Sequence, residues 1–254
     1  MSDPWRLDGR VALVTGAGRG LGRGCAVELA RAGARVVVVS RTESELRETV
    51  AEAVEAGGEA LAIVADVADD RELAGVIEAA SGAGDLRVLV TAAGGNRPGP
   101  ARDYPLADWD LLFGINVRAT FLACRAFGDA LLTRGAGGSI VTLSSQMGSV
   151  GYPGRVAYCA TKHAVDGITR ALGVEWAREG IRVNAVAPTF VETPMTKQWL
   201  EDPVFREEVL ERRLPTGRLA QIEDVANAVR YLACDASSSV TGHILKVDGG
   251  WTAW

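Results

Sequence analysis

Short runs of β-branched and aliphatic residues alternate with longer amphipathic stretches along almost the whole chain. The runs that indicate strands cover residues 11–15, 36–40, 60–65, 88–92, 139–143, 182–187 and 244–247. Nearly all of them are separated by stretches with apolar residues at helical spacing. Continuous apolar strands such as the four valines at 36–39 suit a sheet covered on both faces, and strand-helix-strand units force parallel pairing. The pattern therefore predicts an α/β fold with a doubly wound, seven-stranded parallel sheet and helices on both faces.

The stretch after the first strand shows how local signals agree. Gly22 opens it and Gly33 ends it at a position that favours a left-handed backbone. One face of the helix carries the apolar residues Cys25, Ala26, Leu29 and Ala30. We expect this face to pack on the sheet.

Domain organisation follows from the same alternation. No internal repeat or long linker interrupts it, so we expect one dinucleotide-binding and catalytic domain over residues 1–254. The segment at about 189–215, between the last two strands, carries three prolines among charged and aromatic residues. We interpret it as a substrate lid built from short helices.

Composition and charge narrow the class of protein. With 254 residues, of which 48% are hydrophobic and 23% charged, the chain can bury a large core, which excludes a disordered chain or a disulfide-stapled miniature domain. No purely aliphatic run is longer than the six residues 60–65, and the first residues lack an apolar signal region, so we expect a soluble, cytoplasmic protein. A formal charge of −5 without a basic block predicts binding of neither nucleic acid nor membrane.

Cysteine and histidine usage argues against a metal site. The cysteines are scattered and there are two histidines, so a zinc site built from these residues is not expected. We interpret the cysteines, which are Cys25, Cys124, Cys159 and Cys234, as reduced core residues.

A glycine-rich segment, Thr15-Gly16-Ala17-Gly18-Arg19-Gly20-Leu21-Gly22, directly follows the first predicted strand and leads into a helix. Glycines at such a turn let the backbone approach a phosphate closely, and the positive end of the helix favours an anion. The position within a strand-helix-strand unit therefore predicts a nucleotide site rather than a plain tight turn.

Tyr158 and Lys162 are four residues apart in a helical pattern that we predict to run from about 156 to 179, which places them on one face. A free phenol has a pKa of about 10, and a nearby ammonium lowers it toward the range useful for proton exchange with an alcohol. Ser144 and Ser145 end the fifth strand, at the sheet edge where open α/β folds bind ligands. A hydroxyl there can hold a substrate oxygen beside the phenol.

These motifs together resemble the short-chain dehydrogenase/reductase family. The glycine loop has the spacing T-G-x-x-x-G-x-G, and Ser145 stands before Tyr158 as in the family's Ser…Tyr-x-x-x-Lys pattern. The resemblance implies a Rossmann fold and a catalytic set of Ser145, Tyr158, Lys162 and Asn116. For Asn116, which would hold a water linking the lysine to solvent, a buried structural amide is the alternative.

The resemblance extends over the whole chain. It implies that cofactor contacts come from Gly16, Arg19, Gly20, Leu21, Gly22, Asp66, Val67, Ala93, Gly94, Tyr158, Lys162, Pro188, Val191 and Thr193. Two departures stand out. Thr189 replaces a glycine in the segment that holds the nicotinamide in the family, so the backbone geometry of the turn is left open there. Thr91 replaces an asparagine, so a strand-stabilising hydrogen bond is either lost or made by Thr91.

The end of the second strand indicates which cofactor binds. An Asp or Glu there would accept a hydrogen bond from the adenosine ribose 2′-hydroxyl of NAD, but this chain has Ser40 followed by Arg41. Arg41 offers a planar fork of donors, Arg19 is placed to reach the same phosphate, and Ser40 adds a hydroxyl. We therefore expect NADP(H) to be preferred over NAD(H).

The family resemblance implies hydride transfer between a nicotinamide and a secondary alcohol or ketone. We expect substrate contacts from Asn96, Gln146, Tyr152 and Phe190, with Gly95, Arg97, Trp199 and Trp254 nearby. This mixture suits a small polar or cyclic substrate, such as a sugar acid, polyol or hydroxyketone. Arg97 could pair with a carboxylate or lie in solvent.

Alternatives remain open at this point. A β-ketoacyl carrier protein reductase is disfavoured because Glu179 stands where such enzymes tend to have a basic residue, although Arg178 adjoins it. A non-catalytic nucleotide-binding regulator is disfavoured by the intact Ser, Tyr and Lys. A dehalogenase relative would be expected to lack the glycine loop.

We also expect a homotetramer, by resemblance to the family's two symmetric contacts. The helix that carries Tyr158 has small residues that permit close helix approach, and an apolar final strand precedes two tryptophans. The residues concerned are Ala160, Ala164, Gly167, Ala171, Trp251 and Trp254. Packing of the alanines against the sheet is the alternative.

Overall fold

The computed structural model describes residues 3–193, 196 and 200–253. The strands are β1 (Arg10–Thr15), β2 (Arg35–Ser40), β3 (Glu59–Val64), β4 (Asp85–Thr91), β5 (Gly138–Leu143), β6 (Ile181–Pro188) and β7 (Ile244–Val247). The α-helices of the described part are α1 (Gly20–Arg31), α2 (Glu43–Glu55), α3 (Asp70–Gly82), α4 (Leu106–Leu112), α5 (Ala119–Thr133), α6 (Val156–Glu175), α8 (Pro203–Glu207) and α9 (Ile222–Ala233).

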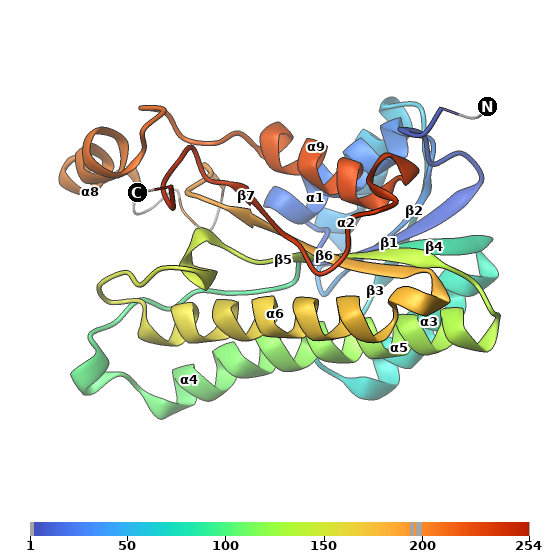
Figure 1. The fold of residues 1–254 in the computed structure, drawn as a ribbon, viewed down its shortest axis with the longest axis horizontal. Coiled ribbons are helices and arrows are strands. Elements are labelled where there is room, and N and C mark those ends of the chain that lie inside the picture. Colours follow the sequence, from blue (N-terminus) through green and yellow to red (C-terminus); the bar gives the residue numbers. More distant parts are fainter. Residues whose placement is uncertain (1–2, 194–195, 197–199, 254) are drawn as a thin grey trace.

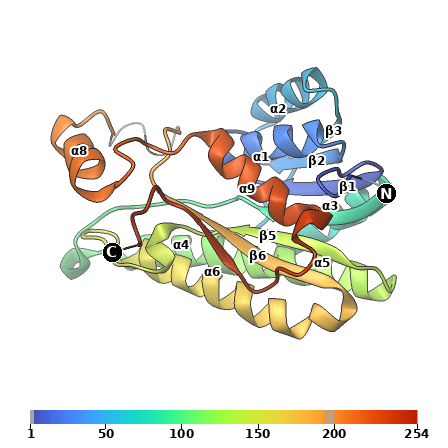
Figure 2. The same ribbon diagram turned by 45° about the horizontal axis from the view of Figure 1, so that its top comes forward.

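The strands form one parallel sheet in the order β3-β2-β1-β4-β5-β6-β7. In Figure 1 the sheet is seen between two layers of helices, with α1 and α9 above it and α4, α5 and α6 below. Figure 2 shows the same separation after a turn of the molecule. The predicted doubly wound fold is confirmed, and each strand lies within three residues of its predicted bounds.

Each face of the sheet has its own core. Alternate residues of one strand point to opposite faces, so Val36 and Val38 pack under α1 and α9, while Val37 and Val39 pack over the α3 and α5 side. All four valines are fully buried. This explains the continuous apolar run, because a strand covered on both faces has no polar side.

Two helix boundaries differ from the sequence prediction. Helix α1 begins at Gly20 rather than Gly22, since the glycine loop turns into the helix earlier. Its end is as expected, with Gly33 at a φ of +100°. Helix α6 ends at Glu175, not 179; residues Ala177–Glu179 form a separate 3₁₀ turn before Gly180, whose φ is +75°.

The helical stretch Leu106–Thr133 has the length and hydropathy of a membrane span, and half of its most apolar window is buried inside the protein. It joins α4 and α5 through a π-helical segment, Phe113–Arg118. Phe127 and Leu131 of α5 are fully buried against the sheet, as in the core helix of a globular domain.

The segment predicted to be a lid contains α8 and a second π-helical segment, Glu208–Arg213. Figure 1 shows α8 at one end of the molecule, on the same side as the C-terminus. Buried Val209 and Leu214 join Phe190 and Trp251 in a small separate core. The described part of this segment is therefore anchored by apolar packing over the carboxyl end of the sheet.

Candidate active site

A cleft with a volume of about 400 Å³ lies at the carboxyl ends of β1, β2, β4, β5 and β6. Every predicted cofactor residue lines it, together with Ser145, and these residues come from segments spread over the chain. They are Gly16, Arg19, Gly20, Leu21, Gly22, Ser40, Arg41, Asp66, Val67, Ala93, Gly94, Tyr158, Lys162, Pro188, Val191 and Thr193. The fold thus brings the separate sequence motifs to one place.

The glycine loop needs its glycines for two reasons. Gly16 has a φ of +65°, and a Cβ there would lie 2.5 Å from the backbone nitrogen of Ala93. A Cβ on Gly22 would lie 2.2 Å from the carbonyl oxygen of Gly16. Arg23 also fixes the loop, because its guanidinium donates a hydrogen bond to the Gly18 carbonyl at 2.5 Å. The loop is therefore held close to β4, with room above it for a phosphate.

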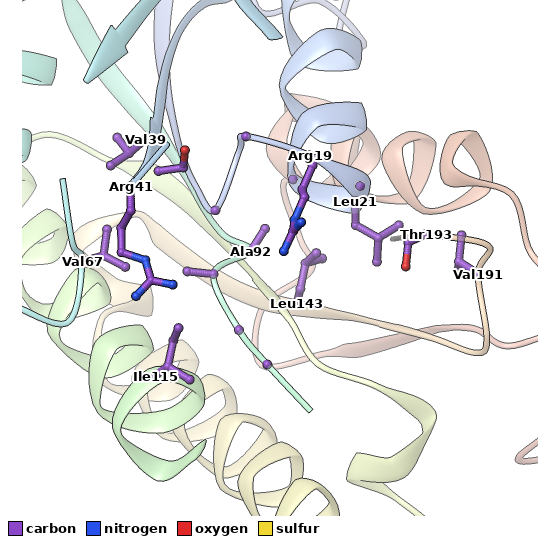
Figure 3. A pocket seen from close by; sticks show the side chains of 18 of the residues that line it. Arg19, Leu21, Val39, Arg41, Val67, Ala92, Ile115, Leu143, Val191 and Thr193 are labelled. Carbon is purple, nitrogen blue, oxygen red and sulfur yellow. The ribbon is translucent and has the colours of Figure 1, made fainter. Parts of the chain in front are cut away.

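Two arginines and two carboxylates meet at the end of β2. Figure 3 shows the Arg19 and Arg41 side chains directed into the cleft. Arg41 lies 3.8 Å from Asp66, and Arg19 lies 3.7 Å from Glu45, as measured between nitrogen and oxygen. Both arginines are about 70% exposed, so these ion pairs are weak. A phosphate entering this end of the cleft would meet two available guanidinium groups.

The opposite end of the cleft is formed after β6. Thr189 is buried there, and its hydroxyl oxygen has no hydrogen-bond partner among the described residues. Among those residues only glycines have a positive φ, so Thr189 fits without strain where a glycine is usual. The backbone N–H of Thr193 donates a hydrogen bond to the Thr196 hydroxyl oxygen at 3.0 Å. This end offers polar groups suited to a carboxamide.

The catalytic residues predicted from sequence come together. Ser145 follows β5 and caps a 3₁₀ turn, Gln146–Gly148, by accepting a hydrogen bond from the Met147 N–H at 3.2 Å. The Ser145 hydroxyl lies close enough to the Tyr158 phenol to act to lower its pKa. The Lys162 ammonium lies 5.6 Å from the centre of the Tyr158 ring and donates to the Leu143 carbonyl at 2.7 Å. A phenol, a hydroxyl and an ammonium thus share one wall.

The electrostatics of this wall differ from the sequence expectation. Burial raises the pKa of Tyr158 to about 12, although Ser145 and the charge of Arg155 act to lower it. Burial also lowers the pKa of Lys162 to about 8, against the opposing charge of Asp166. The expected lowering of the phenol pKa by the lysine is therefore wrong, because desolvation of the phenol is the larger effect.

Asn116 is buried in the π-helical segment between α4 and α5. Its side-chain oxygen accepts from the Gly95 N–H at 2.8 Å, and its amide donates to the Gly95 carbonyl and the Thr161 hydroxyl at 3.0 and 3.1 Å. The side chain thus joins the loop after β4 to α6, which supports the alternative of a buried structural amide. That Asn116 holds a water linking Lys162 to solvent stays a prediction.

Thr91, in place of an asparagine, does not take over that residue's hydrogen bond. It is buried at the end of β4, and its hydroxyl oxygen has no hydrogen-bond partner within the described residues. The strand-stabilising hydrogen bond is therefore lost, which is one of the two outcomes that the sequence left open.

Four aromatic rings form a cluster that packs against Tyr158, and none of the four is among the residues that line the cleft. Tyr152 and Phe190 lie edge to face, with centroids 6.2 Å apart, and both contact Phe205 and Trp251. Trp251 is buried in this cluster rather than exposed for contact with another copy. Sequence patterns did not single out Phe205, since aromatic residues in an irregular segment give no periodic signal.

The other predicted wall residues have mixed surroundings. Gln146 is almost fully buried and Asn96 is half-buried; each has a side-chain oxygen with no hydrogen-bond partner in the described part of the chain. Arg97 lies 3.3 Å from the Asp108 carboxylate, so its charge is already partnered. Gly95 lines the cleft. Trp199 and Trp254 lie outside the described residues.

A nicotinamide dinucleotide fits what the cleft offers. The bare glycine loop leaves space for phosphates, two arginines face the end of β2, and the unpaired Thr189 hydroxyl marks a polar site at the other end. Glu45 and Ile115 also line the cleft, although the sequence analysis did not name them. Both lie on helices, where only the fold shows which side chains face the cleft.

Comparison with known proteins agrees with this geometry. A family profile described as enoyl-(acyl carrier protein) reductase matches residues 16–252. The chain is 38% identical to a D-threitol dehydrogenase of Mycolicibacterium smegmatis, over 98% of this chain and 95% of that protein. It is 41% identical to a galactitol 2-dehydrogenase (L-tagatose-forming) of Cereibacter sphaeroides, over 98% of each chain.

Among solved structures, a gluconate 5-dehydrogenase from Burkholderia cenocepacia in complex with NADP and tartrate superposes with a TM-score of 0.94. It is 34% identical and covers 99% of this chain and 98% of its own. These matches span almost the whole length of this chain. The chain belongs to the short-chain dehydrogenase/reductase family, a family of nicotinamide-dependent oxidoreductases.

Proposed function

We propose that the protein is an NADP(H)-dependent oxidoreductase that interconverts a secondary alcohol and a ketone on a polyol or sugar acid. The observation that carries the proposal is the shared wall of Ser145, Tyr158 and Lys162 beside a dinucleotide-shaped cleft. The named activities of the relatives, which act on threitol, galactitol and gluconate, support the substrate class.

Each residue has a separate part in the reaction. The Tyr158 hydroxyl donates a proton to the substrate oxygen in reduction and takes it back in oxidation. The Ser145 hydroxyl donates a hydrogen bond to that oxygen and fixes its position beside the phenol. Lys162 provides positive charge that stabilises the phenolate left after proton transfer. A bound nicotinamide nucleotide would supply or accept the hydride.

The substrate side of the cleft suits a compact hydroxylated molecule. The aromatic cluster of Tyr152, Phe190, Phe205 and Trp251 packs against Tyr158, where it would give a bound substrate an apolar wall and exclude water. The side-chain oxygens of Gln146 and Asn96 have no hydrogen-bond partner among the described residues, so we expect them to accept hydrogen bonds from substrate hydroxyls. Sites of this kind use a few placed polar groups within apolar walls to orient a ligand.

A substrate panel tests the proposal. Purified protein is assayed with NADPH against ketoses, keto-aldonic acids and β-ketoesters, and with NADP⁺ against polyols and aldonic acids. We expect the highest kcat/KM on a polyol or sugar acid pair. Faster turnover of a β-ketoester would favour a ketoacyl reductase, and no turnover despite tight binding of NADPH would favour a non-catalytic nucleotide-binding protein.

We also propose a homotetramer. Gly167 and Ala171 of α6 are exposed and not packed on the sheet, and Val174 on the same helix is 79% exposed. Light scattering should report about four times the chain mass of 26.7 kDa. Val174→Glu should lower the measured mass, because it buries a charge in the contact, whereas Val204→Glu, at a similarly exposed valine on α8, should not. A stable wild-type monomer at micromolar concentration would contradict the assembly.

A further inference from the structure

A buried carboxylate lies behind the catalytic wall and has no part in the reaction described above. Asp166 of α6 is 1% exposed, and its Oδ1 accepts a hydrogen bond from the Ser144 hydroxyl at 2.5 Å. Ser144 is itself 3% exposed and directly precedes Ser145. Aspartate is rarely buried so completely without a partner of opposite charge.

The position of Asp166 connects it with both Lys162 and Ser145. It follows Lys162 by four residues and Tyr158 by eight on the same helix, so it lies on the Lys162 face. Lys162 is 8% exposed, and the nearby charge of Asp166 acts to raise its pKa. Through Ser144 the same carboxylate holds the backbone that carries Ser145.

The second oxygen of this carboxylate supports an electrostatic role. Oδ2 is buried and has no hydrogen-bond partner among the described residues. The turn beside it leaves no room for another group, since a Cβ on Gly148 would lie 2.9 Å from both Oδ2 and the Ser144 oxygen. Packing alone does not account for such an oxygen, because an apolar residue would fill the space at lower cost.

Other charged groups also face the carboxylate. Lys246 of β7 and Arg170 and His163 of α6 all act to lower the pKa of Asp166, while burial raises it. Lys246 also contacts the Ser149 hydroxyl. Lys162 differs from these groups because it lies in the cleft beside Tyr158, where its ammonium has only the Leu143 carbonyl as a hydrogen-bond acceptor among the described residues.

We propose that Asp166 is a positioning residue that fixes the Ser144–Ser145 backbone and supplies the negative charge that keeps Lys162 protonated. The proposal rests on the proposed function of Ser145, Tyr158 and Lys162. It assigns to Asp166 no contact with substrate or cofactor.

The charge role can be tested without turnover, because the chain has three lysines, Lys162, Lys197 and Lys246. The holoprotein with NADP⁺ and the free protein are labelled with carbon-13 at lysine Cε, and the Lys162 signal is assigned with Lys162→Arg. Asp166→Asn keeps the shape and an acceptor for Ser144 but removes the charge. We expect the pKa of Lys162 to fall by roughly one unit in this variant.

Glu175→Gln is the matched control, since it removes an exposed carboxylate from the end of the same helix. It should leave the Lys162 titration in place. An unchanged Lys162 titration in Asp166→Asn, or equal shifts in both variants, would overturn the charge role. This result does not depend on any substrate, so it is distinguishable from a failure of the proposed function.

The backbone role is tested with Ser144→Ala, which removes the hydrogen bond and keeps the charge. We expect kcat to fall at least about fivefold with little change in the Lys162 titration, whereas Asp166→Asn should lose activity mainly above the lowered pKa of Lys162. Wild-type kcat in Ser144→Ala would overturn the backbone role. Should Asp166→Asn fail to fold, Asp166→Glu keeps the charge but moves it relative to the Lys162 ammonium. We then expect a shifted Lys162 titration, and an unchanged one would overturn the charge role.

Discussion

Replacement of Tyr158 by phenylalanine should abolish turnover and leave NADPH binding within a few-fold of wild type. In the proposed reaction the phenolic proton is needed for the chemistry, whereas the glycine loop and the arginines at the end of β2 line the cleft that would hold the dinucleotide. Loss of a positioned acid removes about 10²–10⁴-fold in rate. Steady-state kinetics on the best substrate of the panel, together with fluorescence titration of NADPH, measure the two effects separately.

Tyr231→Phe provides the control for Tyr158→Phe. Tyr231 lies on α9 and packs on Trp5, with ring centroids 5.8 Å apart, away from the cleft. This variant removes one phenolic hydroxyl of the same kind and should retain wild-type kcat. A Tyr158→Phe protein that kept a tenth of the wild-type rate would show that another group donates the proton.

The pH dependence of the two directions should differ. With a pKa of about 12, Tyr158 is protonated at neutral pH, which favours donation and hence reduction. The pKa of Lys162, about 8, lies below its ordinary value, so the ammonium is present below pH 8 and is lost above it. We therefore expect reduction to be flat below pH 8 and to fall above it, while oxidation, which needs a phenolate, rises with pH.

Much of this site could be predicted because its signals are local. The strands are short valine-rich runs, the glycine loop is contiguous, and Tyr158 and Lys162 are spaced by one helical turn. Each pattern fixes a position relative to a strand end, and in a parallel sheet those ends meet at one edge. For this reason every cofactor residue expected from sequence lines one cleft.

The remaining features depend on three-dimensional surroundings. The pKa of Tyr158 follows from burial, which no spacing in the sequence reports. Asp166 resembles any acid on an amphipathic helix until the fold places it against Ser144. Glu45 resembles a solvent-exposed helix residue, yet it lies in the cleft beside Arg19.

The cofactor preference should be at least tenfold in kcat/KM for NADP(H) over NAD(H). Arg41 and Arg19 must leave their ion pairs with Asp66 and Glu45 to bind a 2′-phosphate. Exposed ion pairs of this kind contribute about 0.2–1 kcal/mol each. Hydrogen bonds to a charged group contribute about 1.5–3 kcal/mol. The exchange therefore favours the phosphate, and tenfold corresponds to about 1.4 kcal/mol.

Three variants divide this preference among its sources. Arg41→Ala should reduce the preference. Ser40→Asp should reverse it, because a carboxylate at the end of β2 accepts a hydrogen bond from the ribose hydroxyl of NAD and repels a phosphate. Glu45→Gln should tighten NADP⁺ binding several-fold in calorimetric titration and leave NAD⁺ unchanged, since it frees Arg19 and removes a negative charge from the cleft.

Glu48→Gln separates a local effect of Glu45 from a change in net charge. Glu48 lies on the same helix as Glu45, but it is 64% exposed and pairs with Arg23 outside the cofactor cleft. If the effect is local to the cleft, only Glu45→Gln alters NADP⁺ affinity, because the interaction between exposed charges is screened within about 10 Å at ordinary ionic strength. If the wild-type protein had equal kcat/KM with NADP(H) and NAD(H), this would show that Arg19 and Arg41 remain paired with Glu45 and Asp66 when the dinucleotide binds.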